Sequence, residues 1–146
     1  MPDFTVEDRE AIRQRGAFLI DKGYLFGQKG DVFRFRGRDV VFFFWNEQPP
    51  YDDAQSTITF FETAETFEVG ECAVAFSDFR EIWPECTARE DILLSLDFIE
   101  KHYDLVTSRE WCRTMRKRWD DIYRRSGRHG YANLVEFDRS TLDEWV

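Results

Sequence analysis

Residues 32–45 read VFRFRGRDVVFFFW, which is the pattern of a β-hairpin. Over residues 32–36 phenylalanine alternates with arginine, and this period of two is typical of a strand with one buried face. Gly37-Arg38 can form a two-residue hairpin loop with glycine first. Residues 40–45 are apolar on both faces. This run therefore predicts a central strand that is covered on both sides or lies at an interface.

Further strands are expected on both sides of this hairpin. Residues 24–27 form a weak first strand, and residues 46–55, with two prolines and two aspartates in succession, form an exposed loop. The strand pattern resumes over residues 57–61, and Phe67 and Val69 extend it or form a short strand of their own. Residues 72–76 alternate between larger and smaller side chains. We therefore expect them to be the last strand of a meander, with a helix packed closely on its small residues.

Three helices are expected outside the meander. Thr5 and Asp8 form a variant of the capping box, and apolar residues at helical spacing follow, so one helix is expected over residues 6–22, with Gly23 ending it. Capping boxes also begin at Thr87 and at Thr107. An apolar stripe with i, i+3, i+4, i+7 spacing follows each of them, so the sequence predicts two further helices.

The order of these elements predicts an α+β fold formed by one domain over residues 1–146. An antiparallel β-meander of four to five strands would carry the N-terminal helix and the two C-terminal helices on one face. The opposite face of the sheet would then be open, and a homodimer could bury it. Residues 126–146 are expected to be a loop and a docked C-terminal tail, or else to mark a partner site, through Leu134, Phe137, Leu142 and Trp145.

Acidic residues are concentrated in the middle of the chain. The net charge is −9, but residues 39–100 hold fifteen Asp and Glu against Arg80 and Arg89 alone, which gives −13. The flanking sections each carry +2. A section this acidic repels nucleic-acid phosphate and attracts a basic surface, over the roughly 8 Å that physiological salt allows. A solubilising surface is the alternative interpretation.

The motifs of common enzymes and cofactor sites are absent from the sequence. It contains no glycine-rich phosphate loop and no GxSxG motif, and His102 and His129 lack a second ligand at metal-binding spacing. The cysteines are expected to be small buried side chains, because their spacing fits neither a zinc site nor a disulfide framework; they are Cys72, Cys86 and Cys112. We therefore expect no catalytic residues, no metal and no cofactor.

The candidate partner-binding residues are acidic and aromatic. Asp52-Asp53 follows Tyr51 in the proline-containing loop, and Trp45 ends the apolar strand. A second group recurs every third residue and would form an acidic ridge: Glu62, Glu65, Glu68 and Glu71. The carboxylates would steer a basic protein, and Trp45 and Tyr51 would anchor it. A solvated strand edge that discourages aggregation is the alternative for the ridge.

Nucleic acid is not expected to be a partner. Arg34, Arg36 and Arg38 are interleaved with Phe33 and Phe35, and aromatic platforms with basic rims do bind single strands. However, alternation along a strand would turn these phenylalanines away from the arginines. The acidic excess of the whole chain also opposes binding.

A family resemblance rests on residues 32–45 and on the segment ILLSLDFIEKHYDLVTSREW over residues 92–111. With a preceding helix and an acidic middle section, this organisation resembles the small acidic immunity proteins of bacterial polymorphic toxin systems. The resemblance extends in outline from Thr5 to about Arg125. It implies a function, namely the neutralisation of a cognate toxin by tight stoichiometric binding, and it assigns no individual residue.

The expected function is therefore that of a non-catalytic immunity protein with a basic protein partner. The alternatives are a subunit or adaptor of another assembly, or an inhibitor that mimics the charge of nucleic acid. A small enzyme or ligand-binding domain is a further alternative. No run reaches the ~18–20 apolar residues of a membrane span, and the first ten residues lack a basic signal region, so we expect a cytoplasmic protein without a membrane partner.

Overall fold

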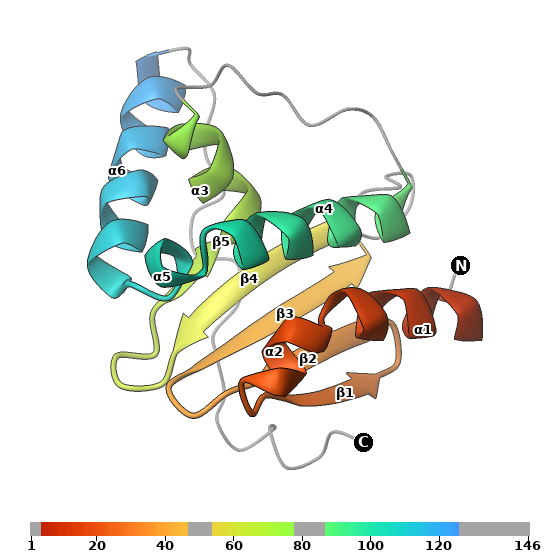
Figure 1. The fold of residues 1–146 in the computed structure, drawn as a ribbon. Helices are drawn as coiled ribbons and strands as arrows, with labels where there is room; N and C mark the ends of the chain where they lie inside the picture. The colour runs from red at the N-terminus through yellow and green to blue at the C-terminus, as the bar shows by residue number, and fades with distance from the viewer. Residues whose placement is uncertain (1–3, 47–53, 78–86, 126–146) are drawn as a thin grey trace.

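The computed structural model describes residues 4–46, 54–77 and 87–125 of the chain. It contains a five-stranded antiparallel sheet with the strand order β1-β2-β3-β4-β5, so that neighbours in the chain are neighbours in the sheet (Figure 1). The strands are β1 (Leu25–Lys29), β2 (Val32–Arg36), β3 (Val40–Asn46), β4 (Ala54–Phe60) and β5 (Thr66–Glu68). The expected α+β fold with an antiparallel meander is confirmed.

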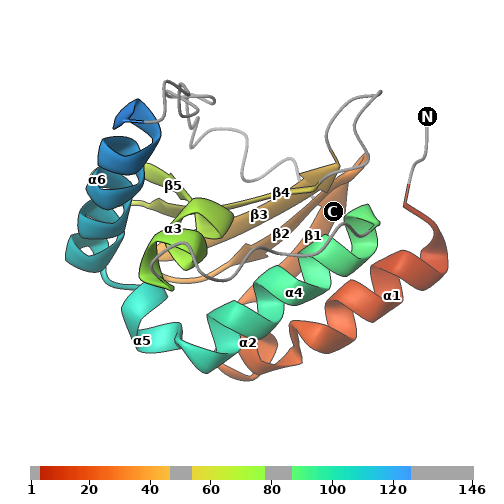
Figure 2. The same ribbon diagram turned by 90° about the horizontal axis from the view of Figure 1, so that it is seen from above.

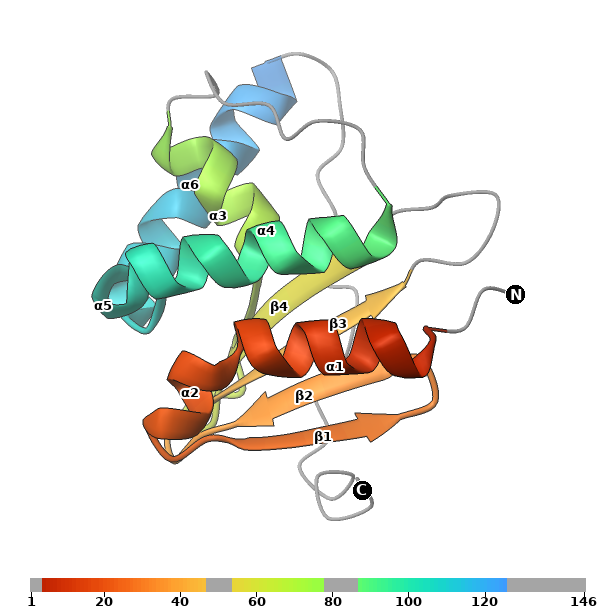
Figure 3. The same ribbon diagram turned by 45° about the vertical axis from the view of Figure 1, so that its right-hand side comes forward.

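The helices are α1 (Val6–Arg15), α2 (Ala17–Asp21), α3 (Val69–Phe76), α4 (Ala88–Lys101), α5 (Tyr103–Val106) and α6 (Arg109–Arg125). Helices α1 and α4 lie side by side across the same face of the sheet, as Figures 2 and 3 show from two directions. Helix α3 packs on β4, and α6 packs on α3 and β5. No helix in the described part of the chain has the length and the apolar character that a membrane crossing needs.

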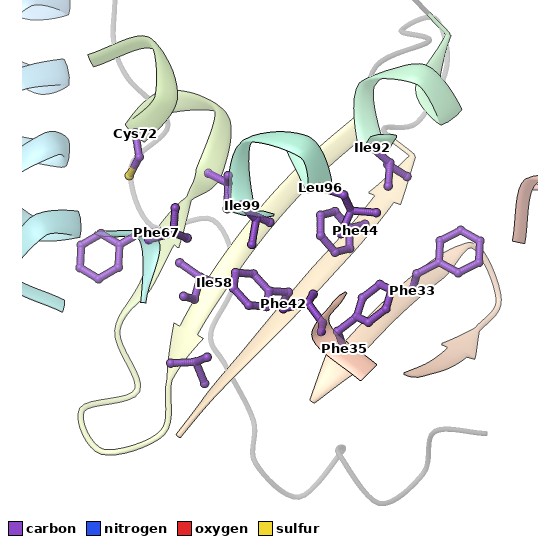
Figure 4. Packing of buried hydrophobic residues seen from close by; sticks show 14 of the residues in the cluster. Phe33, Phe35, Phe42, Phe44, Ile58, Phe67, Cys72, Ile92, Leu96 and Ile99 are labelled. Carbon is purple, nitrogen blue, oxygen red and sulfur yellow. The ribbon is translucent and has the colours of Figure 1, made fainter. Parts of the chain in front are cut away.

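The core lies between the sheet and this helical layer. The register places Phe35 opposite Phe42, and Phe42 opposite Ile58, so that these side chains share one face of the sheet. Figure 4 shows how they point toward Leu96 and Ile99 of α4. All of these side chains are buried. The alternation of phenylalanine with arginine in the sequence therefore identified the buried face correctly.

One buried polar contact joins the sheet to the helical layer. Ser56 of β4 and Ser95 of α4 are both buried, and the Ser56 hydroxyl donates a hydrogen bond of 2.8 Å to Ser95 Oγ. A buried hydroxyl without a partner is costly, so the two residues satisfy each other.

The N-terminal helix differs from the single helix that the sequence predicts over residues 6–22. Thr5 caps α1 with the reciprocal hydrogen bonds of a capping box, as expected. The helix then breaks at Gly16 into α1 and α2. A Cβ atom at Gly16 would lie 2.2 Å from Cζ of Phe35, which is far inside van der Waals contact. Glycine is therefore required here by the close approach of the helix to the sheet.

Residues 72–76 are helical, and the prediction of a strand there is wrong. They belong to α3, whose buried residues include Val69, Cys72 and Ala73. With Phe76 these residues have the i, i+3, i+4, i+7 spacing of a helix, which coexists in the sequence with the alternation that suggested a strand. The helical conformation is adopted in preference to the extended one because the helix packs on both β4 and α6. Of the small residues, Ala73 and Ala75 are buried.

Helix α4 begins where its capping signal predicts, whereas α6 begins one residue later than the capping box at Thr107 predicts, because Ser108 Oγ accepts the hydrogen bond from the backbone N–H of Trp111. The Thr87 hydroxyl accepts a hydrogen bond of 3.2 Å from the backbone N–H of Glu90 at the start of α4. The apolar stripe that predicts one helix as far as Tyr103 is interrupted at His102, which separates α4 from α5. The expected loop and docked tail at residues 126–146 lie outside the described residues.

Candidate functional site

The four glutamates of the predicted acidic ridge lie in one region next to α6. Glu62 and Glu65 belong to the connection between β4 and β5, Glu68 ends β5, and Glu71 lies in the first turn of α3. Both α3 and β5 contact α6, so these carboxylates lie beside a helix that is rich in arginine. The ridge therefore faces basic side chains of the same chain as well as solvent.

Two of these glutamates form ion pairs with α6. Glu65 accepts hydrogen bonds from two nitrogens of the Arg113 guanidinium, with Nε at 3.0 Å. Arg113 thereby holds the pKa of the Glu65 carboxyl below its usual value. Arg109 Nη1 lies 3.4 Å from a carboxylate oxygen of the exposed Glu62. These contacts give Glu62 and Glu65 a structural role, because they fasten the connection between β4 and β5 to α6.

Glu71 has a different environment, since its side chain is half-buried between α3 and α6. Burial raises its pKa from 4.5 to about 7, and the negative charge of Asp120 acts in the same direction. A hydrogen bond with Glu68 and the charge of Arg116 oppose this shift. Near neutral pH a substantial fraction of Glu71 is therefore uncharged, so it contributes less to a negative surface than an exposed glutamate does.

Of the other predicted residues, Trp45 pairs with the start of β4, whereas Glu62 and Glu65 follow the end of that strand. Trp45 is half-buried near the end of β3, where its register partner is Gln55 of β4. Its side chain lies on the face of the sheet opposite to Phe44 and the core. The remaining three residues, Tyr51, Asp52 and Asp53, lie outside the described residues, between β3 and β4. The structure thus separates Trp45 from Glu62 and Glu65, but Glu68 shares its face of the sheet, two register positions along β4.

Two of the concave regions in the described part of the chain lie beside these elements. The larger, of about 710 Å³, lies at the junction of α2, α4 and α5 and is lined by Phe18, Asp21, Lys22, Glu100, Lys101, His102, Tyr103, Asp104 and Leu105. Its three carboxylates are offset by two lysines, and Lys22 Nζ lies 4.4 Å from the centre of the Tyr103 ring. The smaller, of about 320 Å³, lies between β5 and α6 and includes Glu65, Arg113 and Asp120.

A cluster of aromatic rings beside the larger concavity was missed in the sequence. Phe76, at the end of α3, is 39% exposed, and its ring centre lies 5.0 Å from that of His102 and 5.6 Å from that of Trp111. Phe98 contacts the same residues. Aromatic side chains with partial exposure are common anchors in protein interfaces.

The described cysteines do not form a reactive or metal-binding group. Cys72 and Cys112 are free and buried, as expected. A hydrogen bond with Cys112, together with burial, raises the pKa of the Cys72 thiol, so the nucleophilic thiolate is disfavoured. Across residues 4–46, 54–77 and 87–121, no three His, Cys, Asp or Glu side chains are grouped as metal ligands.

The arrangement of β2 bears on the nucleic-acid alternative. Arg34 is only 6% exposed, and it lies on the face opposite to the buried Phe33 and Phe35. A phosphate backbone could therefore not reach Arg34 without rearrangement, and the phenylalanines are unavailable for base stacking. The phenylalanines of this alternation belong to the core.

Comparison with known proteins does not add to these observations. The chain matches no protein-family model, no curated protein and no solved structure.

Proposed function

We propose that this protein is a non-catalytic binding protein of the cytoplasm, an immunity protein that neutralises a cognate bacterial toxin by covering a basic surface of that toxin. The proposal rests on the resemblance in organisation and on the charge of the chain. It needs a negative surface to attract the toxin and an aromatic side chain to anchor it.

The observation that carries the proposal is the excess of carboxylates. The chain has 29 acidic and 20 basic side chains, so at least nine carboxylates have no basic partner of their own, whatever pairs form inside the fold. Glu62, Glu65 and Asp97 of the acidic section form ion pairs with arginines. The remaining negative charge would accelerate association with a basic protein at low ionic strength.

Steering is assigned to Asp52 and Asp53, since Glu62 and Glu65 are held by α6. Tyr51 and Trp45 would supply the anchor, because Trp45 is half-buried at the end of β3 from which this segment of the chain continues. The ridge glutamates would act indirectly in this arrangement, by fixing β5 and α6 in place. The partner would then approach the end of the sheet where β3 leads into β4.

Affinity capture followed by a growth assay tests the proposal. Tagged full-length protein is used as bait in its native cells, and the expected result is one basic protein recovered in equal amount. Expressed alone, that protein should arrest growth, and co-expression of the present chain should restore it. Capture of a stable subunit without toxicity would favour the adaptor alternative. Capture of a nucleic-acid-binding protein that is displaced by DNA would favour charge mimicry.

A matched pair of variants tests the assigned surface. The test variant is Asp52→Lys/Asp53→Lys. The control variant, Glu7→Lys/Glu10→Lys, changes the net charge by the same amount, but its two residues are exposed on α1 and do not belong to the assigned surface. At low salt the first pair should slow association with the captured protein by about tenfold, and the second should have a much smaller effect. Equal effects of the two pairs would show that only the total charge matters, and the assignment to Asp52 and Asp53 would be wrong.

A further inference from the structure

Glu71 places a carboxyl group in the contact between α3 and α6. Its side chain is half-buried in the first turn of α3, and α3 and α6 pack on each other beside β5 (Figures 1 and 2). The carboxyl oxygen Oε2 is buried and has no hydrogen-bond partner among the described residues. Such an oxygen costs far more free energy when the carboxyl group is charged than when it is protonated. The charge state of Glu71 therefore affects how well α6 packs.

The charges that face Glu71 are mostly negative. Glu68, the last residue of β5, shares a hydrogen bond with Glu71, and Asp120 approaches from α6. The opposing positive charge is that of Arg116, which also belongs to α6. Strand β4, on which α3 packs, contains no charged residue. Helix α4 meets the far end of α3 through the ring contacts of Phe76. The electrostatic balance at Glu71 is therefore set by β5 and α6.

The two glutamates form a pair that holds a proton. A hydrogen bond between two carboxyl groups requires that one of them be protonated, and groups in such contact titrate as a pair. The Glu68–Glu71 pair therefore carries one negative charge while it keeps this proton and two after the proton is lost. The neighbouring Cys72 thiol stays neutral, because a hydrogen bond and burial raise its pKa. The second charge would thus repel Asp120 across the contact between α3 and α6.

Opening of α6 would also break two ion pairs. Arg109 and Arg113 of α6 hold Glu62 and Glu65 of the connection between β4 and β5. Both arginines belong to the first turns of α6, so they leave with the helix when it separates from α3 and β5. In the open state these two glutamates would be unpaired carboxylates. The population of that state determines how often a partner could find them.

We propose that the Glu68–Glu71 pair is a pH-sensitive switch for the packing of α6. While the pair holds its proton, α6 stays packed on α3 and β5. Once the proton is lost, the helix opens more often and frees Glu62 and Glu65. A partner that binds these carboxylates would therefore bind more tightly at pH 8 than at pH 6. The switch does not depend on the toxin-binding proposal, because it requires no partner and none of the residues assigned to the toxin.

Native-state hydrogen exchange of the full-length chain, followed by NMR at pH 6 and pH 8, tests this proposal. After correction for intrinsic exchange rates, the amides of Cys112, Arg113 and Met115 report the opening of α6. They should be less protected than the amides of Phe42 and Phe44 in β3. Their exchange should also depend less on added urea, because α6 opens without unfolding of the sheet.

The protection of the α6 amides should fall by about five- to tenfold between pH 6 and pH 8. A pKa that is raised from 4.5 to about 7 in the packed state changes the opening equilibrium by about tenfold over this interval, and the partial exposure of Glu71 reduces the effect. In Glu71→Gln the side-chain amide can donate to Glu68 without a titrating proton, so this fall should disappear. The control Asp121→Asn removes a negative charge from an exposed position of α6 and should retain the fall.

Other results would overturn the proposal. Equal protection and equal urea dependence of the α6 and β3 amides at pH 8 would show that α6 opens only when the whole protein unfolds. A fall that persists in Glu71→Gln, or that disappears in Asp121→Asn, would assign the pH dependence to other groups. If Glu71→Gln does not fold, the side-chain carboxyl carbons of Glu68 and Glu71 are titrated in the unaltered protein. A midpoint above pH 6 for the pair supports the switch, and ordinary midpoints near 4.5 for both residues overturn it.

Discussion

Substitution of Gly16 by alanine tests the close approach of the N-terminal helix to the sheet. The new methyl group would lie 2.2 Å from Cζ and 2.4 Å from Cε1 of Phe35. The Phe35 ring is buried and contacts Phe26 and Phe44, with ring centres 4.9 and 6.0 Å away, so it has little room to move. The helix and the sheet must therefore separate to accept the methyl group.

The expected magnitude follows from two opposing effects. Overpacking of a core costs about 1–3 kcal/mol. Gly16 has a φ of −85°, which alanine adopts without strain, so the lower entropy of the unfolded chain returns about 0.4–1 kcal/mol. The net loss of unfolding free energy should be about 1–2 kcal/mol. For a chain of this length that loss lowers the Tm by roughly 3–8 °C.

Urea denaturation of three variants measures this effect. Gly16→Ala should lower the midpoint with an unchanged slope, and adding Phe35→Leu, which removes the clashing ring atoms, should cost less than the sum of the single changes. Gly70→Ala is the control, because its Cβ would meet only the flexible end of Glu68, at 3.1 Å. A Gly16→Ala protein as stable as the unaltered one would refute the steric explanation, as would strict additivity with Phe35→Leu.

Two further predictions concern the glutamates beside α6. The pKa of Glu71 is raised from 4.5 to about 7, so its stabilising effect is complete below pH 4.5 and is lost as the pH rises through 7. The free energy of unfolding of Glu71→Gln, measured relative to that of the unaltered protein, should therefore be higher at pH 8 than at pH 5. With allowance for the partial exposure of Glu71, the difference should be on the order of 1–2 kcal/mol. Urea titrations at the two pH values measure it. Arg113→Ala should raise the pKa of Glu65 in an NMR titration, because Arg113 is the main cause of its lowering; an unchanged pKa would contradict the ion pair.

The strands and the helix starts could be predicted because each depends on local chemistry. The Phe-Arg alternation of β2 identified its buried face, and Thr5 and Thr87 marked the starts of α1 and α4. The break at Gly16 could not be predicted in this way. It depends on Phe35, which is distant in the sequence and meets Gly16 only in the folded protein.

The candidate site was less predictable than the fold, because a carboxylate looks the same in sequence whether it is free or paired. Glu65 meets Arg113 across 48 positions of the chain, and no local pattern shows that contact. Residues 69–76 carried both a strand-like and a helix-like pattern, and tertiary packing decided between them. The aromatic cluster around Phe76 was missed for the same reason.

The strand order has a consequence for how the protein folds. Each strand pairs with the strand next to it in the chain, and the connections β1–β2 and β2–β3 are short. Bringing the ends of a short loop together costs little chain entropy, and folding rates rise as contacts become more local. Folding of the meander can therefore begin at its hairpins. Helices α4 and α6 would then pack on strands that have already paired.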